Sequence, residues 1–377
     1  MVSDLIVVAD RRPWAPGDTY QLMSRLLLDR RVLWLDANAL RRERGDGPAC
    51  APALPERGPR PVDAPFPVLR AEDLGVGAHP LARLVSPRLM ARRLERAAHK
   101  QGLRQPILWL ASPWAAPLLD GFEHAPVVYQ VSREPPPGDP GLAREWAQQE
   151  ARILNRADLI LAPCRELAQS LASERTHLLP PGVDLELFST PTQPARDLPH
   201  HGPVAGCHGG FGADFDAALF AAIAARLPRW RFMLLGPMSC ELSGLCDLPN
   251  VHIAGRRPHD QLPRYLQFWQ ASLLLRHPRA QIPKAPALTF LEALAAGLPV
   301  VVAGGANLGN FADLTLRGDD AETAAAALEA VAHEPRERQL LRRHRVAGQG
   351  WDARAAAASQ LLAVFDAGTL GAVAGRR

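Results

Sequence analysis

The feature that most constrains the fold is a regular alternation of short apolar runs with longer amphipathic stretches. Residues 5–9, 32–36 and 127–130 are short and mostly apolar, whereas residues 142–155 have the apolar spacing of a helix. Short strands that alternate with helices pack into a parallel sheet with helices on both faces. The sequence therefore predicts a doubly wound α/β protein.

The alternation stops at a polar, proline-rich stretch, residues 189–203, and then starts again. A chain of 377 residues is too long for one ordinary α/β core, and it suits two domains of roughly 150–190 residues each. We therefore predict a first domain over residues 1–188, a linker over 189–203 and a second domain over 204–351. A closing helix, residues 352–366, is expected to pack back on the first domain.

Composition and charge exclude several classes of protein. The net charge of +4 is too small to indicate nucleic-acid binding, and the five cysteines do not have the spacing of a zinc site. No stretch approaches the roughly 18 apolar residues of a membrane span. The apolar run 5–9 is also too short for the core of a signal peptide. We expect a cytoplasmic protein with reduced thiols.

Three segments carry more specific information, and they are LPPGVDLELF at 179–188, WRFMLLGP at 230–237 with LPNVHIAG at 248–255, and FLEALAAGLPVV at 290–301. In this order they resemble the GT-B glycosyltransferases of the family-4-like group, especially bacterial members that build exopolysaccharides and wall polymers. The resemblance implies two Rossmann-like domains that face each other across a cleft. It also implies transfer of a sugar from a UDP- or GDP-sugar to a glycan or lipid-linked acceptor, with neither a metal nor another cofactor.

The helix that contains the third segment is the candidate donor site. Pro283 and Pro286 favour a helix start, where free N–H groups and the helix dipole attract an anion such as a nucleoside diphosphate. The resemblance assigns the ribose hydroxyls to Glu292, and the alternative is an ordinary exposed glutamate. Lys284 stands where many relatives have a glutamate, and Thr289 where another branch has a lysine. We interpret Lys284 as a cation for the phosphates, with a solvated loop lysine as the alternative, and Thr289 as a hydroxyl donor.

Two further segments could contribute to that site. Gly209 and Gly210 follow the first strand of the second domain, where glycines let the backbone approach a phosphate or sugar closely. Their context is not G-x-G-x-x-G, so the segment does not indicate a nicotinamide cofactor. Arg279, in the loop after residues 272–275, is a weaker phosphate candidate.

The acceptor side requires a group that takes the proton of the attacking hydroxyl. The strand end at 127–134 reads VVYQVSRE, where the related enzymes carry an acidic signature. Gln130 and Arg133 replace acids of that signature, so Glu134 is the first candidate for the base. Asp139 and Asp18 are the alternatives.

Residues 83–104 carry seven basic residues against one acid, with an apolar stripe at helical spacing. Such a helix could lie on anionic lipid, which would suit a lipid-linked acceptor, or it could be a solvated helix with core contacts. Two alternatives to transfer also stay open. The changes at 130, 133 and 284 are compatible with a noncatalytic homologue that binds a sugar nucleotide or a partner enzyme. A sugar-nucleotide epimerase would need paired carboxylates and a histidine around the sugar.

Overall fold

The structure is a computed structural model that describes residues 2–9, 17–40, 65–69, 72–74, 87–131, 140–238, 244–280, 282 and 287–366. The chain divides into two compact units. The first consists of Met1–Pro180 with Arg354–Arg377, and the second of Pro181–Ala353. Within the described ranges, no helix is both long enough and apolar enough to cross a membrane.

The first unit is built on a parallel sheet in the strand order β3-β2-β1-β4-β5-β6-β7. The order reverses direction between β1 and β4, as in a doubly wound Rossmann-like sheet. Its described strands are β1 (Leu5–Ala9), β2 (Val32–Asp36), β3 (Val68–Leu69), β4 (Ile107–Leu110), β5 (Val127–Gln130), β6 (Leu159–Ala162) and β7 (Thr176–Leu178).

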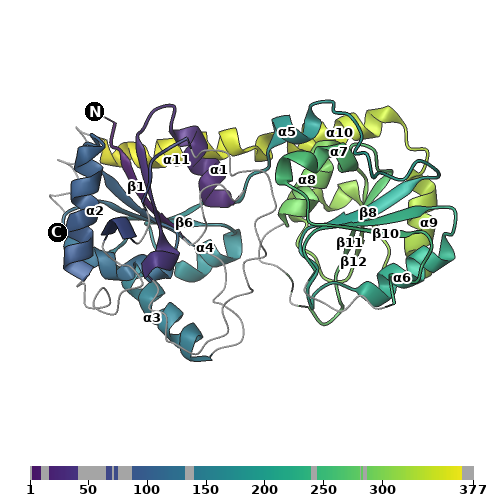
Figure 1. Ribbon diagram of the computed structural model, residues 1–377, viewed down its shortest axis with the longest axis horizontal. Helices are drawn as coiled ribbons and strands as arrows, with labels where there is room; N and C mark the ends of the chain where they lie inside the picture. Colours follow the sequence, from purple (N-terminus) through teal and green to yellow (C-terminus); the bar gives the residue numbers. More distant parts are fainter. Residues whose placement is uncertain are drawn as a thin grey trace. The chain divides into compact units, whose positions relative to one another are not determined.

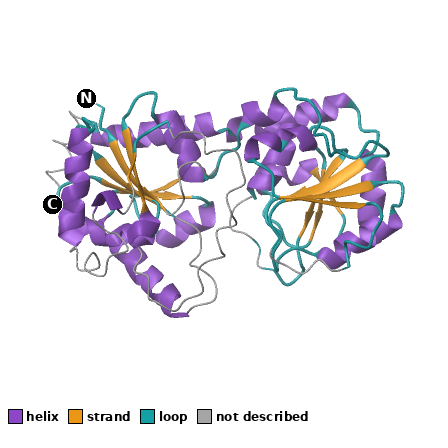
Figure 2. Cartoon of the chain, viewed as in Figure 1, coloured by secondary structure: helices purple, strands orange, loops and turns teal. Residues whose placement is uncertain are grey.

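Helices cover both faces of this sheet, because alternate residues along its strands are buried on opposite sides (Figures 1 and 2). Leu5 and Val7 of β1 lie in a cluster with α1 (Asp18–Leu26) and α11 (Trp351–Leu362). Ile6 and Val8 lie in a second cluster with the helices of the opposite face. These are α2 (Pro87–Lys100), the 3-10 helix η4 (Pro113–Gly121) and α3 (Pro140–Arg156), followed along the chain by α4 (Arg165–Leu171).

The second unit is built on a parallel sheet in the order β10-β9-β8-β11-β12-β13, with the reversal between β8 and β11. Its described strands are β8 (Val204–His208), β9 (Arg231–Leu235), β10 (Val251–Gly255), β11 (Ala271–Leu275), β12 (Val300–Ala303) and β13 (Thr315–Arg317). Ligands of doubly wound sheets bind at the carboxyl ends of the strands, where the strand order reverses. The edge beside β8 and β11 is therefore where a site is expected.

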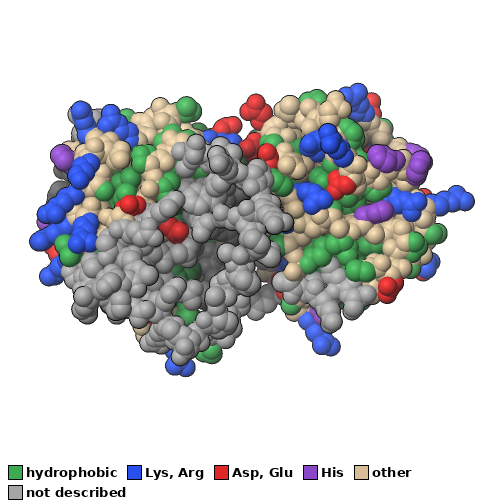
Figure 3. Space-filling view, viewed as in Figure 1, with side chains coloured by type: hydrophobic (Ala, Val, Ile, Leu, Met, Phe, Trp, Pro, Cys, Tyr) green, Lys and Arg blue, Asp and Glu red, His purple; other side chains and the backbone are tan. Residues whose placement is uncertain are grey.

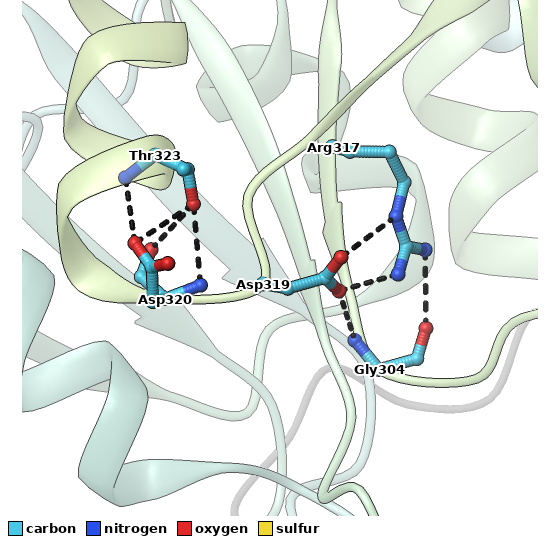
Figure 4. A network of polar contacts seen from close by, with 5 residues as sticks. All are labelled: Gly304, Arg317, Asp319, Asp320 and Thr323. Carbon is cyan, nitrogen blue, oxygen red and sulfur yellow. Dashed lines mark hydrogen bonds and ion pairs between the residues drawn. The ribbon is translucent and has the colours of Figure 1, made fainter.

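Two sets of helices cover this second sheet. One face packs against α5 (Leu185–Ser189), α7 (Pro263–Leu266), α8 (Leu288–Ala296) and α10 (Arg336–Val346). The other packs against α6 (Ala217–Arg226) and α9 (Ala321–Val331). Near the carboxyl ends of β12 and β13, Arg317 pairs with Asp319, and both bond to the backbone of Gly304 (Figure 4). Asp320 and Thr323 form the capping box that begins α9.

The division between the units lies before the predicted linker, and residues 189–203 belong to the second unit. Phe188 is fully buried, and the side-chain amide of Gln267 donates to the carbonyl oxygens of Phe188 and Thr190 at 2.9 and 2.7 Å. Further along, Asp197 accepts from Tyr265 Oη at 2.7 Å. These bonds attach the stretch to the helix side of the second sheet, so a proline-rich composition does not produce a free tether here.

The C-terminal helical region packs on the first unit. Ala358, Leu362 and Phe365 are buried with the strands of the first sheet. Arg30 and Asp366 form a two-bond ion pair, with both N–O distances at 3.0 Å. The end of the described chain is thereby tied to the beginning of the same unit.

The basic helix predicted within residues 83–104 is α2. Its apolar stripe, including Met90, Leu94 and Ala98, is buried in the first core. The apolar side is therefore occupied by the protein itself. The opposite side carries exposed arginines, and Figure 3 shows Lys and Arg side chains grouped where Figure 1 places α2.

Two further helical regions belong to the second unit. Residues 259–270 contain a 3-10 turn, η5 (His259–Gln261), and the single turn α7. Pro263 begins α7 and has no N–H to continue the hydrogen bonding of η5, so the two turns do not form one regular helix although Leu262 between them has helical φ and ψ angles of −56° and −39°. Helix α10 was not predicted, since its arginine-rich sequence has few apolar positions; Val346 is one of its buried residues.

Candidate functional site

The carboxyl ends of β8 and β9 meet in two glycine turns. Gly209 has a φ of 115° and Gly236 a φ of 152°, both outside the range that other residues normally adopt. The Gly209 N–H donates to the carbonyl of Leu235 at 2.9 Å, and a Cβ added to Gly236 would lie 1.7 Å from the Gly209 carbonyl oxygen. Only glycine at position 236 allows the two backbones to come this close.

The end of β8 also lies directly beside the first turn of α8. A Cβ added to Gly209 would lie 2.8 Å from Cγ2 of Thr289, whereas one added to Gly210 would meet no atom of a described residue within 4 Å. Ala287, the residue before α8, supplies no side-chain cap for the N–H groups of the first turn. The structure thus brings Gly209, Gly210 and Thr289 together at a helix start, around open space that no described residue fills.

One turn further along α8, Glu292 is buried between two histidines. Its Oε2 lies 3.0 Å from Nε2 of His208, the last residue of β8, and its Oε1 lies 2.6 Å from Nε2 of His259 in η5. Glu292 is only 2% exposed. We call these three residues the His–Glu–His cluster.

The electrostatics of the cluster favour an ionised carboxylate. Burial raises the pKa of Glu292, but hydrogen bonds from His208 and His259 outweigh it, so the pKa lies below its usual value. Burial lowers the pKa of His259, but the bond to Glu292 and the charges of Asp184 and Asp260 outweigh that effect and raise it. Glu292 is therefore an anion that accepts a hydrogen bond from each histidine.

This arrangement differs from the exposed ribose-binding carboxylate predicted for position 292. Both oxygens are occupied by histidines and covered from solvent. Sequence reasoning missed both histidines. The side of the sheet on which His208 lies was predictable. Alternate residues of a strand face the same side, so His208 faces the same side of β8 as Val204, which packs in the cluster of α8. No local pattern marked His259.

Of the remaining residues predicted for the donor site, the structure describes Arg279 but not Lys284. Arg279 lies in an exposed turn after β11, at the same edge of the sheet, with its N–H bonded to His277 Nδ1 at 3.2 Å. Arg276, one turn earlier, is paired with Asp214 at 3.0 Å. Lys284 lies outside the described residues, as do both prolines that suggested the helix start.

The acceptor-side predictions mostly fall outside the described residues. Glu134, Asp139 and Arg133 are among those residues, so the structure says nothing of them. Asp18 is the first residue of α1. The next residue, Thr19, donates its hydroxyl to Oε1 of Gln130 at the end of β5, at 3.1 Å.

Two residues of the first quoted segment have structural roles. Asp184 begins α5 and accepts from the N–H of Leu187 at 3.1 Å. A Cβ on Gly182 would lie 2.7 Å from the ring of Trp351. Among the residues that the structure describes, no group of three or more His, Cys, Asp or Glu side chains is placed to hold a metal ion.

Comparison with known proteins agrees with this geometry. Residues 216–361 match the family described as "Glycosyl transferase-like". The chain is 29% identical over 218 residues to TuaH of Bacillus subtilis (strain 168), a glycosyltransferase named for teichuronic acid biosynthesis; the match covers 52% of this chain and 54% of that protein. This chain has the GT-B fold, and parts of it are similar to glycosyltransferases. It spans about half the length of the curated relative that it matches.

Solved structures of GT-B glycosyltransferases have the same fold over nearly the whole chain. The α,α-trehalose 6-phosphate synthase of Burkholderia multivorans matches with a TM-score of 0.63 at 14% identity, covering 97% of this chain and 99% of that one. A glycosyltransferase of Rickettsia africae gives 0.65 at 12% identity, with the same coverage. Anabaena Alr3699/HepE in complex with UDP and glucose gives 0.63 at 13% identity, covering 95% and 99%. The prediction of two Rossmann-like domains of the GT-B type is confirmed.

Proposed function

We propose that this protein transfers a sugar from a UDP- or GDP-sugar to a glycan or lipid-linked acceptor in the assembly of a bacterial polysaccharide. The observation that carries the proposal is the second unit's open edge, where Gly209, Gly210 and the uncapped first turn of α8 come together. A helix start combined with close backbone approach suits a diphosphate. Structures of the same fold hold UDP and UDP-glucose, and the related TuaH is named for teichuronic acid biosynthesis.

In this proposal the chain's own groups stabilise the departing nucleoside diphosphate. The N–H groups of α8 and the Thr289 hydroxyl donate to phosphate oxygens, while Lys284 and Arg279 supply positive charge. No metal or other cofactor takes part. Glu134 accepts the proton of the attacking acceptor hydroxyl.

The donor site is tested by titrating the protein with UDP, GDP and their glucose and mannose conjugates, by calorimetry and thermal shift. We expect one nucleotide to raise the melting temperature in proportion to its saturation of the site. Thr289→Val keeps the β-branched shape but removes the hydroxyl, and it should weaken binding by roughly 5–10-fold, about the value of one hydrogen bond. Thr315→Val, far along the chain in β13, is the matched control. No binding of any nucleotide at millimolar concentration would contradict the proposal.

Catalysis is tested separately from binding. Release of free sugar from the bound donor, or its transfer to a glycan, distinguishes an enzyme from a noncatalytic homologue. Glu134→Gln should reduce transfer by about 10²-fold or more, the usual contribution of a general base, while nucleotide affinity stays the same. Binding without hydrolysis or transfer, under conditions that support related enzymes, would favour the noncatalytic alternative.

We also propose that the exposed side of α2 contacts anionic lipid near a lipid-linked acceptor. Arg88, Arg92, Arg96 and Lys100 are exposed on that helix, and Glu95 is the acid among them. Each basic residue near an anionic surface contributes about 1 kcal/mol to the free energy of membrane binding. Sedimentation with phosphatidylglycerol-containing vesicles should exceed that with pure phosphatidylcholine, and Arg92→Gln with Arg96→Gln should reduce it. Equal sedimentation with both vesicles would contradict the contact.

A further inference from the structure

The His–Glu–His cluster presents only one of its members to solvent. The side chains of His208 and Glu292 are 1% and 3% exposed, whereas that of His259 is 19% exposed. A ligand that reaches this part of the carboxyl edge therefore meets the His259 ring before it can meet the carboxylate.

Hydrogen-bond chemistry fixes which atom of His259 faces outward. An ionised carboxylate only accepts hydrogen bonds, so Nε2 of His259 carries its proton toward Glu292 Oε1. The other ring nitrogen, Nδ1, makes no hydrogen bond to a described residue, and it is not among the buried atoms that lack a partner. Nδ1 of His208, in contrast, is buried without a partner. His208 thus holds the carboxylate from inside, and His259 carries a nitrogen that a ligand can reach.

We infer that His259 contacts the bound nucleotide through Nδ1, donating to one of its oxygens, and that Glu292 acts through His259 as a positioning residue. The inference rests on the proposed function and changes the role that sequence reasoning gave to Glu292. The two α8 residues that face this edge, Thr289 and Glu292, are three positions apart and so lie on one side of the helix. Their neighbours are the consecutive residues His208, the last residue of β8, and Gly209 after it. The cluster therefore adjoins the open space described for the phosphates.

The charges around His259 favour the form of the ring that donates from both nitrogens. Glu292 faces it from α8, Asp184 from the start of α5, and Asp260 is next to it in η5. The ring of Phe188 stands edge-on, with ring centroids 5.5 Å apart, and provides an apolar wall. These acids raise the pKa of His259 although burial opposes them. Donation from Nδ1 is present below this pKa and is lost as the pH rises through it, so nucleotide affinity should fall with rising pH.

The experiment is calorimetric titration with UDP-glucose between pH 5.5 and 8.5. UDP-glucose is preferable to UDP, because a terminal phosphate has a second pKa near 6 and would itself titrate in this range. We expect the dissociation constant of the wild type to rise about tenfold or more across the range, the value of a charge-assisted hydrogen bond. Uridine is titrated in parallel to locate the contact. If His259 contacts the ribose, the affinity for uridine shows the same pH dependence; if it contacts the diphosphate, the affinity for uridine does not depend on pH.

Two variants separate the roles within the cluster. His259→Gln can still donate to Glu292 from its amide but loses Nδ1, so it should bind more weakly at pH 5.5 and show a flat pH profile. Glu292→Gln removes the charge and keeps the shape, so it should bind at pH 5.5 with the midpoint of the profile moved to lower pH. Thermal unfolding of both variants checks that the fold is retained.

Two results would overturn the inference while leaving the proposed function intact. One is wild-type affinity in His259→Gln at every pH. The other is loss of binding in Glu292→Gln at every pH while His259→Gln binds normally, because the carboxylate would then be the contact itself. A wild-type protein that binds no nucleotide would instead contradict the proposed function, and the inference with it.

Discussion

Replacing Glu292 with alanine should destabilise the second unit strongly, apart from any effect on binding. The change leaves two histidine N–H donors without their acceptor, of which His208 is buried too deeply for water to reach. A buried donor left unpaired costs about 1–3 kcal/mol, and the lost methylene costs about 0.8 kcal/mol more. Relief from burying a charge offsets part of this cost. We expect the free energy of unfolding of the second unit to fall by about 3 kcal/mol in Glu292→Ala. In Glu292→Gln, which can still accept one of the two hydrogen bonds, it should fall by about 1 kcal/mol.

The pH dependence of this loss distinguishes the cluster from generic packing. The lowered pKa of Glu292 means that its contribution is present above the ordinary value of 4.5 and is lost as the pH falls through the folded-state pKa. The raised pKa of His259 means that its contribution is present below 6.5 and is lost as the pH rises through the folded-state pKa. The hydrogen bond between Glu292 and His259 therefore stabilises the second unit most between pH 4.5 and 6.5.

Urea unfolding of wild type and Glu292→Ala at pH 6 and pH 9 measures this difference. Because the chain has two units, the transition of the second must be followed by itself, for instance through Trp230 or Trp269, both buried there. A loss below 1 kcal/mol at pH 6, or a loss that is larger at pH 9, would refute the argument, since the carboxylate would then not be held as the structure shows.

Three other changes test different parts of the structure. Asp366→Ala leaves Arg30 buried without its counter-charge and should cost the first unit about 3 kcal/mol, the lower end for a broken buried pair; a loss under 1 kcal/mol in urea unfolding would contradict this. Gly236→Ala should destabilise the second unit by more than about 2 kcal/mol, because it adds backbone strain and a clash with the Gly209 carbonyl. An unchanged melting temperature would exclude that contact. Gly210→Ala, by the same measurement, should be nearly neutral, because no atom of the residues that the structure describes lies within 4 Å of the added group.

Strand positions were the most predictable part of the fold. The runs at 5–9, 32–36 and 127–130 were predicted to the residue, because strands buried on both faces are nearly continuous in apolar residues. The division of the chain was less predictable. Composition indicated a linker at 189–203, but polar side chains such as Asp197 and Gln267 attach that stretch to the second unit through bonds between distant positions. Local composition does not record such bonds.

Site residues were predictable only where backbone conformation required them. Gly209 follows a strand and accommodates a close neighbour, which a glycine-rich turn predicts. The environment of Glu292 was not predictable, because its two partners lie 84 and 33 positions away in the sequence. A motif can indicate that a glutamate belongs to a site, but whether its oxygens face a ligand or two histidines depends on tertiary packing.

The two carboxyl edges also differ in the chemistry they offer. In the first unit, Oε1 of Gln130 accepts from Thr19 and from the indole of Trp109, both at 3.1 Å. An indole N–H only donates, so the oxygen must face it and the amide nitrogen must face away. A neutral amide held in this way can orient a hydroxyl but cannot remove its proton. Position 130 is therefore excluded as the base, and Glu134, Asp139 and Asp18 stay the candidates for the proposed proton transfer.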